Sequence, residues 1–415
     1  MRKRVDALSW VDELRQLILF AVLIILALPP LNNASALDSY VMVGGQSGTW
    51  FEHGQNPMLL KIFLSNSSIT RLMAVQSEGT VWTGGWNGSQ WLISGWGTDP
   101  GAEGSDPYLF IYNGEGQVAA GSLDQYASEA SWHGGDVFAV SYNGKYWLLS
   151  GMGSDTLPGF YSNQPVNHMA LATFDGYKFN DLSARVPDQQ ADAILYSNAW
   201  NGTHWMIGGG YDGLGILFAF DGKNIVDLTD RIAQSVTSFS SVQTIRWNGH
   251  YWLIGGVGFL ARFDGHNFVD LTEQLQSVFQ THPTGTTLPI EQAPIMGTLR
   301  RPFPLIVNAI AWNGSTWMLG GGAPVAQRTP NVAWLASYEG NVFVDLSSSL
   351  PKYVGQPQYV GSSILSICAT DTGWIVGGYS DNHAVLLQYE NGLILDISPF
   401  VSNMEYVIWV ATDGA

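Results

Sequence analysis

The stretch Trp317-Met-Leu-Gly-Gly321 decides the fold, because variants of it recur along the chain. Each copy has an aromatic or apolar residue, two further apolar residues and a small pair that ends in glycine, and consecutive copies begin 47 to 65 residues apart. The other copies lie at 41–45, 91–95, 147–151, 205–209, 252–256 and 374–378. A repeat of this length, rich in tryptophan and glycine, predicts the blades of a β-propeller, and its seven copies predict an all-β, seven-bladed molecule.

The sequence around the quoted stretch predicts one complete blade of four strands, at 308–312, 317–321, 334–338 and 342–346. Asn313-Gly314 separates the first two strands, and Glu339-Gly340 separates the last two. Asn-Gly and related pairs favour tight hairpins because type I′ turns need positive φ. An aspartate ends the fourth strand in five copies, at Asp181, Asp227, Asp270, Asp345 and Asp396. Its recurrence indicates a structural carboxylate that accepts backbone hydrogen bonds.

The two ends of the chain complement each other. Predicted blade seven opens with Ala-Thr-Asp at 369–371 and runs on to the repeat at 374–378. The last stretch, 404–414, ends in the same Ala-Thr-Asp and a glycine, but no copy of the repeat follows it. The missing continuation lies at 38–45. We therefore predict that these two segments pair to complete blade one, a Velcro closure that leaves no open sheet edge.

Residues 1–36 have the pattern of a secretory signal peptide. Arg2, Lys3, Arg4 and Arg15 precede an apolar run at 17–28, and Ala34-Ser-Ala36 follows. A basic start, an apolar stretch and an Ala-x-Ala site are typical of such leaders. We expect cleavage after Ala36, which leaves the propeller at 37–415.

The alternative is that the run at 17–28 stays as a single membrane anchor. A membrane span needs about 20 apolar residues, and Pro29 and Pro30 come too early for that. In both cases the basic flank stays in the cytoplasm, so we expect an extracytoplasmic propeller, either secreted or held at the cell surface.

Composition limits the partners and the chemistry. The net charge of −17 repels nucleic acid and anionic lipid, so neither is expected as a partner. Cys368 is the only cysteine, so no intramolecular disulfide forms, and its apolar neighbours predict a core residue. The sequence contains no zinc spacing, phosphate loop, nucleophile elbow or nucleotide fingerprint, and we expect no cofactor, metal or catalytic residue.

Two repeat families resemble this one. The Gly-Gly pair after a β-strand resembles kelch repeats, although tryptophan here precedes the pair and kelch aromatics follow it. The stretch 311–317, Ala-Trp-Asn-Gly-Ser-Thr-Trp, resembles the Asp-box of sialidase-like propellers, but it is one residue shorter and has asparagine in place of aspartate. The resemblance covers 37–415 as a fold and transfers no active site.

The predicted blades have two unlike faces. The turns between strands one and two, and between three and four, are tight, whereas the other connections are predicted to be long, as at 46–57, 96–107, 152–169, 210–215, 322–333 and 379–384. Function concentrates on variable loops that a rigid scaffold holds, so this long-loop face is the predicted binding face. Its candidate ligand-binding residues are Trp50, Trp96, Asp99, Tyr161, Tyr211, Arg328, Tyr379 and His383.

Aromatic side chains beside amides and carboxylates suit sugars or peptides. The first hypothesis is therefore a non-enzymatic module that binds a protein, a peptide or a surface glycan. The second is a hydrolase or lyase of extracellular polysaccharide that uses two carboxylates as acid and base, drawn from Asp99, Asp155, Asp212 and Asp381. The third is a scaffold subunit of a membrane complex, which requires that residues 17–28 remain uncleaved.

Overall fold

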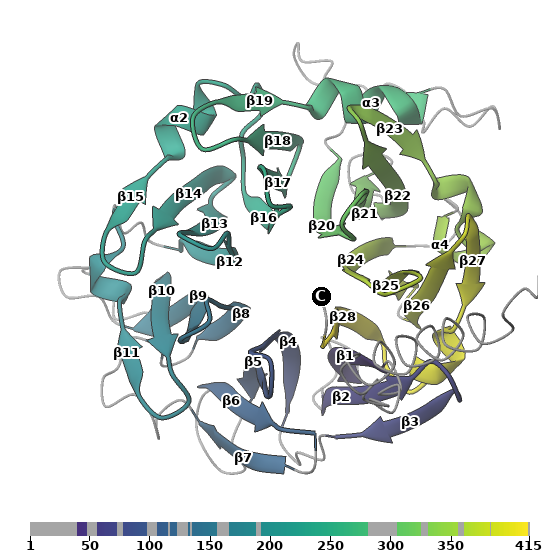
Figure 1. Ribbon diagram of the computed structural model, residues 1–415, viewed down its shortest axis with the longest axis horizontal. Coiled ribbons are helices and arrows are strands. Elements are labelled where there is room, and N and C mark those ends of the chain that lie inside the picture. Colours follow the sequence, from purple (N-terminus) through teal and green to yellow (C-terminus); the bar gives the residue numbers. More distant parts are fainter. Residues whose placement is uncertain are drawn as a thin grey trace, which may run out of the picture.

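Seven four-stranded antiparallel sheets surround a central axis in the computed structural model (Figure 1). The structure describes residues 40–47, 56–72, 78–97, 106–114, 117–122, 132, 135–155, 166–187, 192–280, 305–324, 331–355, 361–381 and 383–413. The predicted leader at 1–36 lies outside these residues. Within the described ranges, no helix is long and apolar enough to cross a membrane. The predicted seven-bladed propeller is confirmed.

Each sheet is one blade. Blade one contains β28 (Tyr406–Thr412), β1 (Tyr40–Ser47), β2 (Asn56–Phe63) and β3 (Ser68–Arg71). Blade two contains β4 (Gly79–Trp86), β5 (Trp91–Gly97), β6 (Asp106–Tyr112) and β7 (Gln117–Ser122). Blade three contains β8 (Asp136–Tyr142), β9 (Trp147–Asp155), β10 (Val166–Phe174) and β11 (Phe179–Asp181). Blade four contains β12 (Ile194–Trp200), β13 (Trp205–Tyr211), β14 (Leu214–Phe220) and β15 (Ile225–Asp227).

The remaining blades repeat this order. Blade five contains β16 (Val242–Trp247), β17 (Trp252–Gly256), β18 (Phe259–Phe263) and β19 (Phe268–Asp270). Blade six contains β20 (Ile306–Trp312), β21 (Trp317–Pro324), β22 (Asn331–Glu339) and β23 (Val342–Asp345). Blade seven contains β24 (Ser362–Ala369), β25 (Gly373–Ser380), β26 (His383–Glu390) and β27 (Leu393–Asp396). Short helices follow the outer strands: η2 (Ser183–Arg185), α2 (Thr229–Ala233), α3 (Thr272–Gln280), η3 (Ser347–Ser349), α4 (Lys352–Gly355) and η4 (Ser398–Val401).

The first strand named above for each blade lies next to the axis, as Figure 1 shows for β28, β4, β8, β12, β16, β20 and β24. The second strand carries the repeat, in which three apolar or aromatic residues precede a small pair that ends in glycine. In blade one the innermost strand is the last strand of the chain: β28 pairs antiparallel with β1, from Val41 opposite Thr412 to Gln46 opposite Tyr406. The described chain therefore begins and ends within the same sheet.

The recurrent aspartates close turns at the outer strands, as predicted. Asp270 Oδ1 accepts the Thr272 N–H at 2.9 Å, and Thr272 Oγ1 accepts the Leu260 N–H on β18 at 3.1 Å. Burial disfavours the charge on Asp270, but hydrogen bonds from Thr237 and Thr272 outweigh this effect and hold the pKa of the carboxyl below its ordinary value. Equivalent pairs of hydrogen bonds occur at Asp181, Asp227, Asp345 and Asp396.

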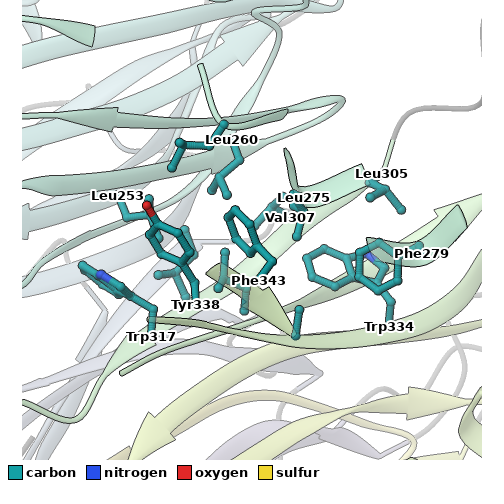
Figure 2. Packing of buried hydrophobic residues seen from close by; sticks show 14 of the residues in the cluster. Leu253, Leu260, Leu275, Phe279, Leu305, Val307, Trp317, Trp334, Tyr338 and Phe343 are labelled. Atoms are coloured by element: carbon teal, nitrogen blue, oxygen red, sulfur yellow. The ribbon is translucent and has the colours of Figure 1, made fainter. Parts of the chain in front are cut away.

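The hydrophobic core is divided into layers between neighbouring blades. In the layer between blades five and six, Leu253 and Leu260 pack against Trp317 and Tyr338 (Figure 2). Repeat tryptophans also bond to the preceding blade: Trp317 Nε1 donates to the Tyr251 hydroxyl at 2.9 Å. Because each layer needs both of its blades, the blades hold one another in place, and their innermost strands have a defined position around the axis.

Candidate ligand site at the propeller axis

Every innermost strand carries a β-bulge opposite the small pair that ends in glycine. In blade six, Val307 pairs with Gly321 and Ala309 pairs with Gly320, so Asn308 has no partner residue on β21. The register shifts at the same place in all seven blades. The bulged residues are Trp82, Phe138, Tyr196, Gln243, Asn308, Leu365 and Ile408. Bulges re-aim a side chain and are frequent beside functional sites.

The second glycine of each repeat makes room for this bulge. A Cβ on Gly321 would lie 1.8 Å from the Ile306 carbonyl oxygen, and one on Gly151 would lie 1.8 Å from the Asp136 carbonyl oxygen. The corresponding distance is between 1.8 and 2.2 Å in all seven blades. No side chain fits there, because the innermost strand crosses close to the glycine backbone. The repeat that defines the fold therefore also builds the bulged edge.

The seven bulged residues form what we name the axial ring. Each is half-buried, whereas the residue before it is buried, so solvent reaches this position in every innermost strand. Phe138 lies 5.4 Å from Trp82 of the preceding blade and 5.5 Å from Tyr196 of the following blade, measured between ring centroids. A side chain that projects from the inner edge of its blade toward the axis is expected to contact the equivalent side chains of both neighbouring blades, as Phe138 does.

The axial ring has three chemically distinct arcs. Trp82, Phe138 and Tyr196 form an aromatic arc over blades two to four. The amides Gln243 and Asn308 follow in blades five and six, and aliphatic side chains complete the ring. The Asn308 amide donates to Ser363 Oγ on the next innermost strand at 2.9 Å, which holds this amide in place. Aromatic faces beside amides are the composition of sites that bind polar ligands with an apolar face, such as sugars.

A buried carboxyl adjoins the aromatic arc. Asp136 lies two residues before Phe138 on β8, toward the predicted long-loop face, and its Oδ1 has no hydrogen-bond partner among the described residues. Burial raises the pKa of Asp136 to about 7, against the opposing effect of the Trp82 indole N–H. Near neutral pH this carboxyl is therefore present in both protonation states.

The structure separates most of the residues predicted to bind a ligand. Trp50, Asp99, Tyr161 and Arg328 lie outside the described residues. Trp96, Tyr211 and Tyr379 are half-buried at the ends of second strands in three different blades, and His383 is exposed at the start of β26. Of the described four, Tyr379 lies 5.0 Å from Tyr406 at the start of innermost strand β28. The role of all eight in binding stays a prediction.

The prediction of long connections on the long-loop face is wrong for two of them, 210–215 and 379–384. Strands β13 and β14 are joined by two residues, Asp212 and Gly213, and β25 and β26 are likewise joined by residues 381 and 382. Asp212 and Asp381 adopt positive φ, 43° and 49°. Aspartate tolerates this left-handed conformation and forms tight hairpins, so these two predicted acid–base candidates are turn residues.

The axial ring itself was missed in the sequence. Alignment of the innermost strands would have revealed it, because one variable column follows a column that is always Val, Leu or Ile. The strands in question are 80–86, 136–142, 194–200, 241–247, 306–312, 363–369 and 406–412. A variable position inside a repeating strand is therefore the sequence signal for the axial ring. Only the bulge shows that the side chain at this position turns toward the axis.

Comparison with known proteins supports the fold and no more. Neither a protein-family model nor a curated protein sequence matches this chain. Among solved structures, a periplasmic gluconolactonase from Pseudomonas aeruginosa is similar, with a TM-score of 0.52 and 8% identity over 90% of this chain and 98% of that one. A Bacteroides uniformis protein provisionally named a 6-phosphogluconolactonase has a TM-score of 0.49 and 10% identity over 90% and 99% of the two chains.

Proposed function

We propose that this chain is a binding module that holds a carbohydrate against the aromatic arc of the axial ring. The observation that carries the proposal is the contact series from Trp82 through Phe138 to Tyr196, which presents half-buried aromatic side chains across three blades. Gln243 and Asn308 add amide groups for ligand hydroxyls. A sugar suits this combination because its ring has apolar faces and polar edges.

The ligand would approach from the face where the innermost strands begin. Trp96, Tyr211 and Tyr379 lie at the matching ends of the second strands and would supply outer contacts. A protein or peptide ligand remains the competing occupant of the same face. The repeated scaffold keeps its own shape while these side chains vary, which is what a binding site grafted onto a fold requires.

We place this activity outside the cytoplasm, on the basis of the predicted leader at 1–36. The propeller would be secreted after cleavage, or anchored by residues 17–28. N-terminal sequencing of the exported protein tests this, because a mature chain that still begins at Met1 excludes cleavage.

The binding proposal predicts that Trp82→Ala and Tyr196→Ala each weaken glycan binding by about tenfold or more, since each removes a large apolar contact worth roughly 1–3 kcal/mol. The measurement is a glycan and peptide binding screen with the full chain, followed by calorimetric titration of each hit. Tyr177→Ala is the matched control, because Tyr177 is an aromatic residue that is 91% exposed in a turn away from the axis.

The proposal is wrong if both axial variants bind every hit as tightly as the unaltered protein. Hits restricted to peptides would instead favour the peptide alternative. Thermal melts of the variants separate lost binding from lost folding.

One observation favours the hydrolase alternative. Asp136 has the raised pKa of a general acid and lies beside the aromatic arc. A glycosidase needs a second carboxylate about 5–10 Å away, and the carboxyls of the turns, such as Asp221, have lowered pKa values instead. Release of new reducing ends from bound glycans, abolished by Asp136→Asn, would establish hydrolysis; unchanged glycans after prolonged incubation would exclude it for that ligand.

A further inference from the structure

Arg246 breaks a pattern that the other six blades keep. It lies three residues after the bulge on β16 and pairs with Leu253. The equivalent residue of every other innermost strand is small: Gly85, Ser141, Ala199, Ala311, Cys368 and Ala411. The chain has only 17 basic residues against 34 acidic ones. A single arginine among six small residues is therefore a local specialisation and not part of the repeat.

The small residues show why this side chain must leave the interface between blades. A Cβ on Gly85 would clash with Val140 of the next blade at 2.9 Å, and no equivalent residue in the other blades has a side chain larger than that of Cys368. Solvent reaches Arg246, yet protein surrounds it closely enough that desolvation lowers the pKa of its guanidinium. Arginine stays charged even so.

Backbone geometry places the guanidinium at the axis. The Asn248 N–H donates to the Tyr251 carbonyl oxygen, so Asn248 points its backbone N–H toward β17. Bonded and non-bonded pairs alternate in antiparallel sheets, and Ile245, three residues earlier, therefore points its N–H and C=O away from β17. That side of β16 is its axial edge. Consistently, the Ile245 N–H donates to Ser197 Oγ on innermost strand β12 at 3.0 Å.

The guanidinium bonds to this same edge. Arg246 Nη1 donates to the Ile245 carbonyl oxygen at 2.8 Å, and within the described part of the chain no carboxylate pairs with it. Arg262 of the same blade is different, because its Nη1 donates to Asn341 Oδ1 at 3.2 Å and its guanidinium lies over the Tyr251 ring. Among the described residues, the other guanidinium donors of Arg246 thus have no side-chain partner at the axis, where an anion would be attracted.

We propose that Arg246 binds the carboxylate of an acidic sugar, a hexuronic acid unit, whose ring packs against the aromatic arc. The carbonyl that holds the guanidinium lies two residues beyond the axial ring on β16, roughly 7 Å away at about 3.3 Å per residue. Tyr196 is on the adjacent innermost strand. A planar guanidinium fork matches a carboxylate, and one isolated arginine matches its single charge better than the double charge of a phosphate.

The assignment rests on the proposed function and is tested by calorimetric titration of the full chain with an oligogalacturonate and with its methyl ester. The ester keeps the shape of the sugar and removes its charge. We expect the acid to bind about 10- to 100-fold more tightly than the ester, as for a charge-assisted hydrogen bond. Arg246→Gln should bind both ligands alike, and Arg262→Gln, the matched control, should keep the preference.

Equal binding of acid and ester by the unaltered protein, or an acid preference that survives in Arg246→Gln, would overturn the assignment. The proposed function would still stand in either case if Trp82→Ala weakened the binding of both ligands. If neither ligand binds while a neutral glycan does, only the acidic-sugar inference fails. If inorganic phosphate displaced the bound oligogalacturonate at lower concentrations than acetate did, the result would indicate a phosphate ligand and overturn the proposal that Arg246 binds a carboxylate.

Discussion

At the scale of single residues, the candidate functional groups lie at positions where one blade departs from the repeat. Asp136 and Arg246 are charged residues at positions of the innermost strand that other blades fill with uncharged ones. The recurrent aspartates are the opposite case, since Asp270 and its equivalents hold turns together, and hydrogen bonds hold the pKa values of Asp270 and Asp396 below the ordinary value. In a repeat protein, a charged group that occurs once is therefore more informative about function than one that recurs.

Asp136 predicts a pH dependence of stability. Its pKa is about 7 in the folded protein against an ordinary value of 3.8, so between these values the folded protein holds a proton that the unfolded chain has released. The free energy of unfolding must then fall as pH rises, by about 1.4 kcal/mol per pH unit and on the order of 4 kcal/mol in total.

Asp136→Asn lacks this dependence because its side chain stays neutral. We expect it to match the unaltered protein in urea unfolding at pH 4 and to exceed it in stability at pH 8. Parallel pH profiles of the two proteins would show that the buried carboxyl does not titrate as described.

At the scale of elements, the second glycine and the bulge form one unit. The glycine allows the innermost strand to approach, and the bulge releases one side chain toward the axis in each blade. The blade is thus built from a constant second strand and a first strand whose bulged residue is free to vary. This division explains how seven similar blades carry an aromatic, an amide and an aliphatic arc.

Gly321→Ala should therefore be strongly destabilising. Its Cβ would meet the Ile306 carbonyl oxygen at 1.8 Å, and backbone cannot move aside as a side chain can. We expect a loss of roughly 2–4 kcal/mol in the free energy of unfolding, measured by chemical denaturation. Gly320→Ala is the matched control, because its Cβ would meet side-chain atoms only, Ile364 Cγ2 at 2.7 Å and Ile364 Cβ at 3.0 Å, so we expect a smaller loss. Equal losses in both variants would argue against the backbone contact.

At the scale of the whole molecule, β28 links the last segment of the chain to the first. It pairs with β1 and packs against β24 and β25 of blade seven, where Val407 and Val410 lie over Gly377. Loss of this strand would expose the edge of β1 and one face of blade seven together. The layers between blades depend on their neighbours, so the damage would extend beyond one blade.

Truncation before Tyr406 should thus prevent stable folding. We expect the shortened chain to lose its cooperative thermal transition in circular dichroism. A chain that ends at Asp413 keeps β28 and serves as the control, with the melting temperature of the full chain. A chain without β28 that melted like the intact protein would contradict the role of this strand.

The sequence by itself determined the blade count, the strand order and most turns. Tryptophan, Gly-Gly and Asn-Gly act through local backbone preferences, so their recurrence is visible in one dimension. The turn role of Asp270 was predicted for the same reason, because its partner Thr272 is two residues away.

Only the tertiary structure decided which side chains meet at the axis. Trp82, Phe138 and Tyr196 are more than fifty residues apart, and ring closure brings them together. Their direction depends on a shift of one residue in strand register, which reverses the side that a residue faces. The Arg246 guanidinium likewise bonds to the Ile245 carbonyl on the axial edge of β16, and the close approach of the next blade at the equivalent Gly85 indicates why it does not lie between blades. These are consequences of packing between distant segments, and local sequence preferences do not encode them.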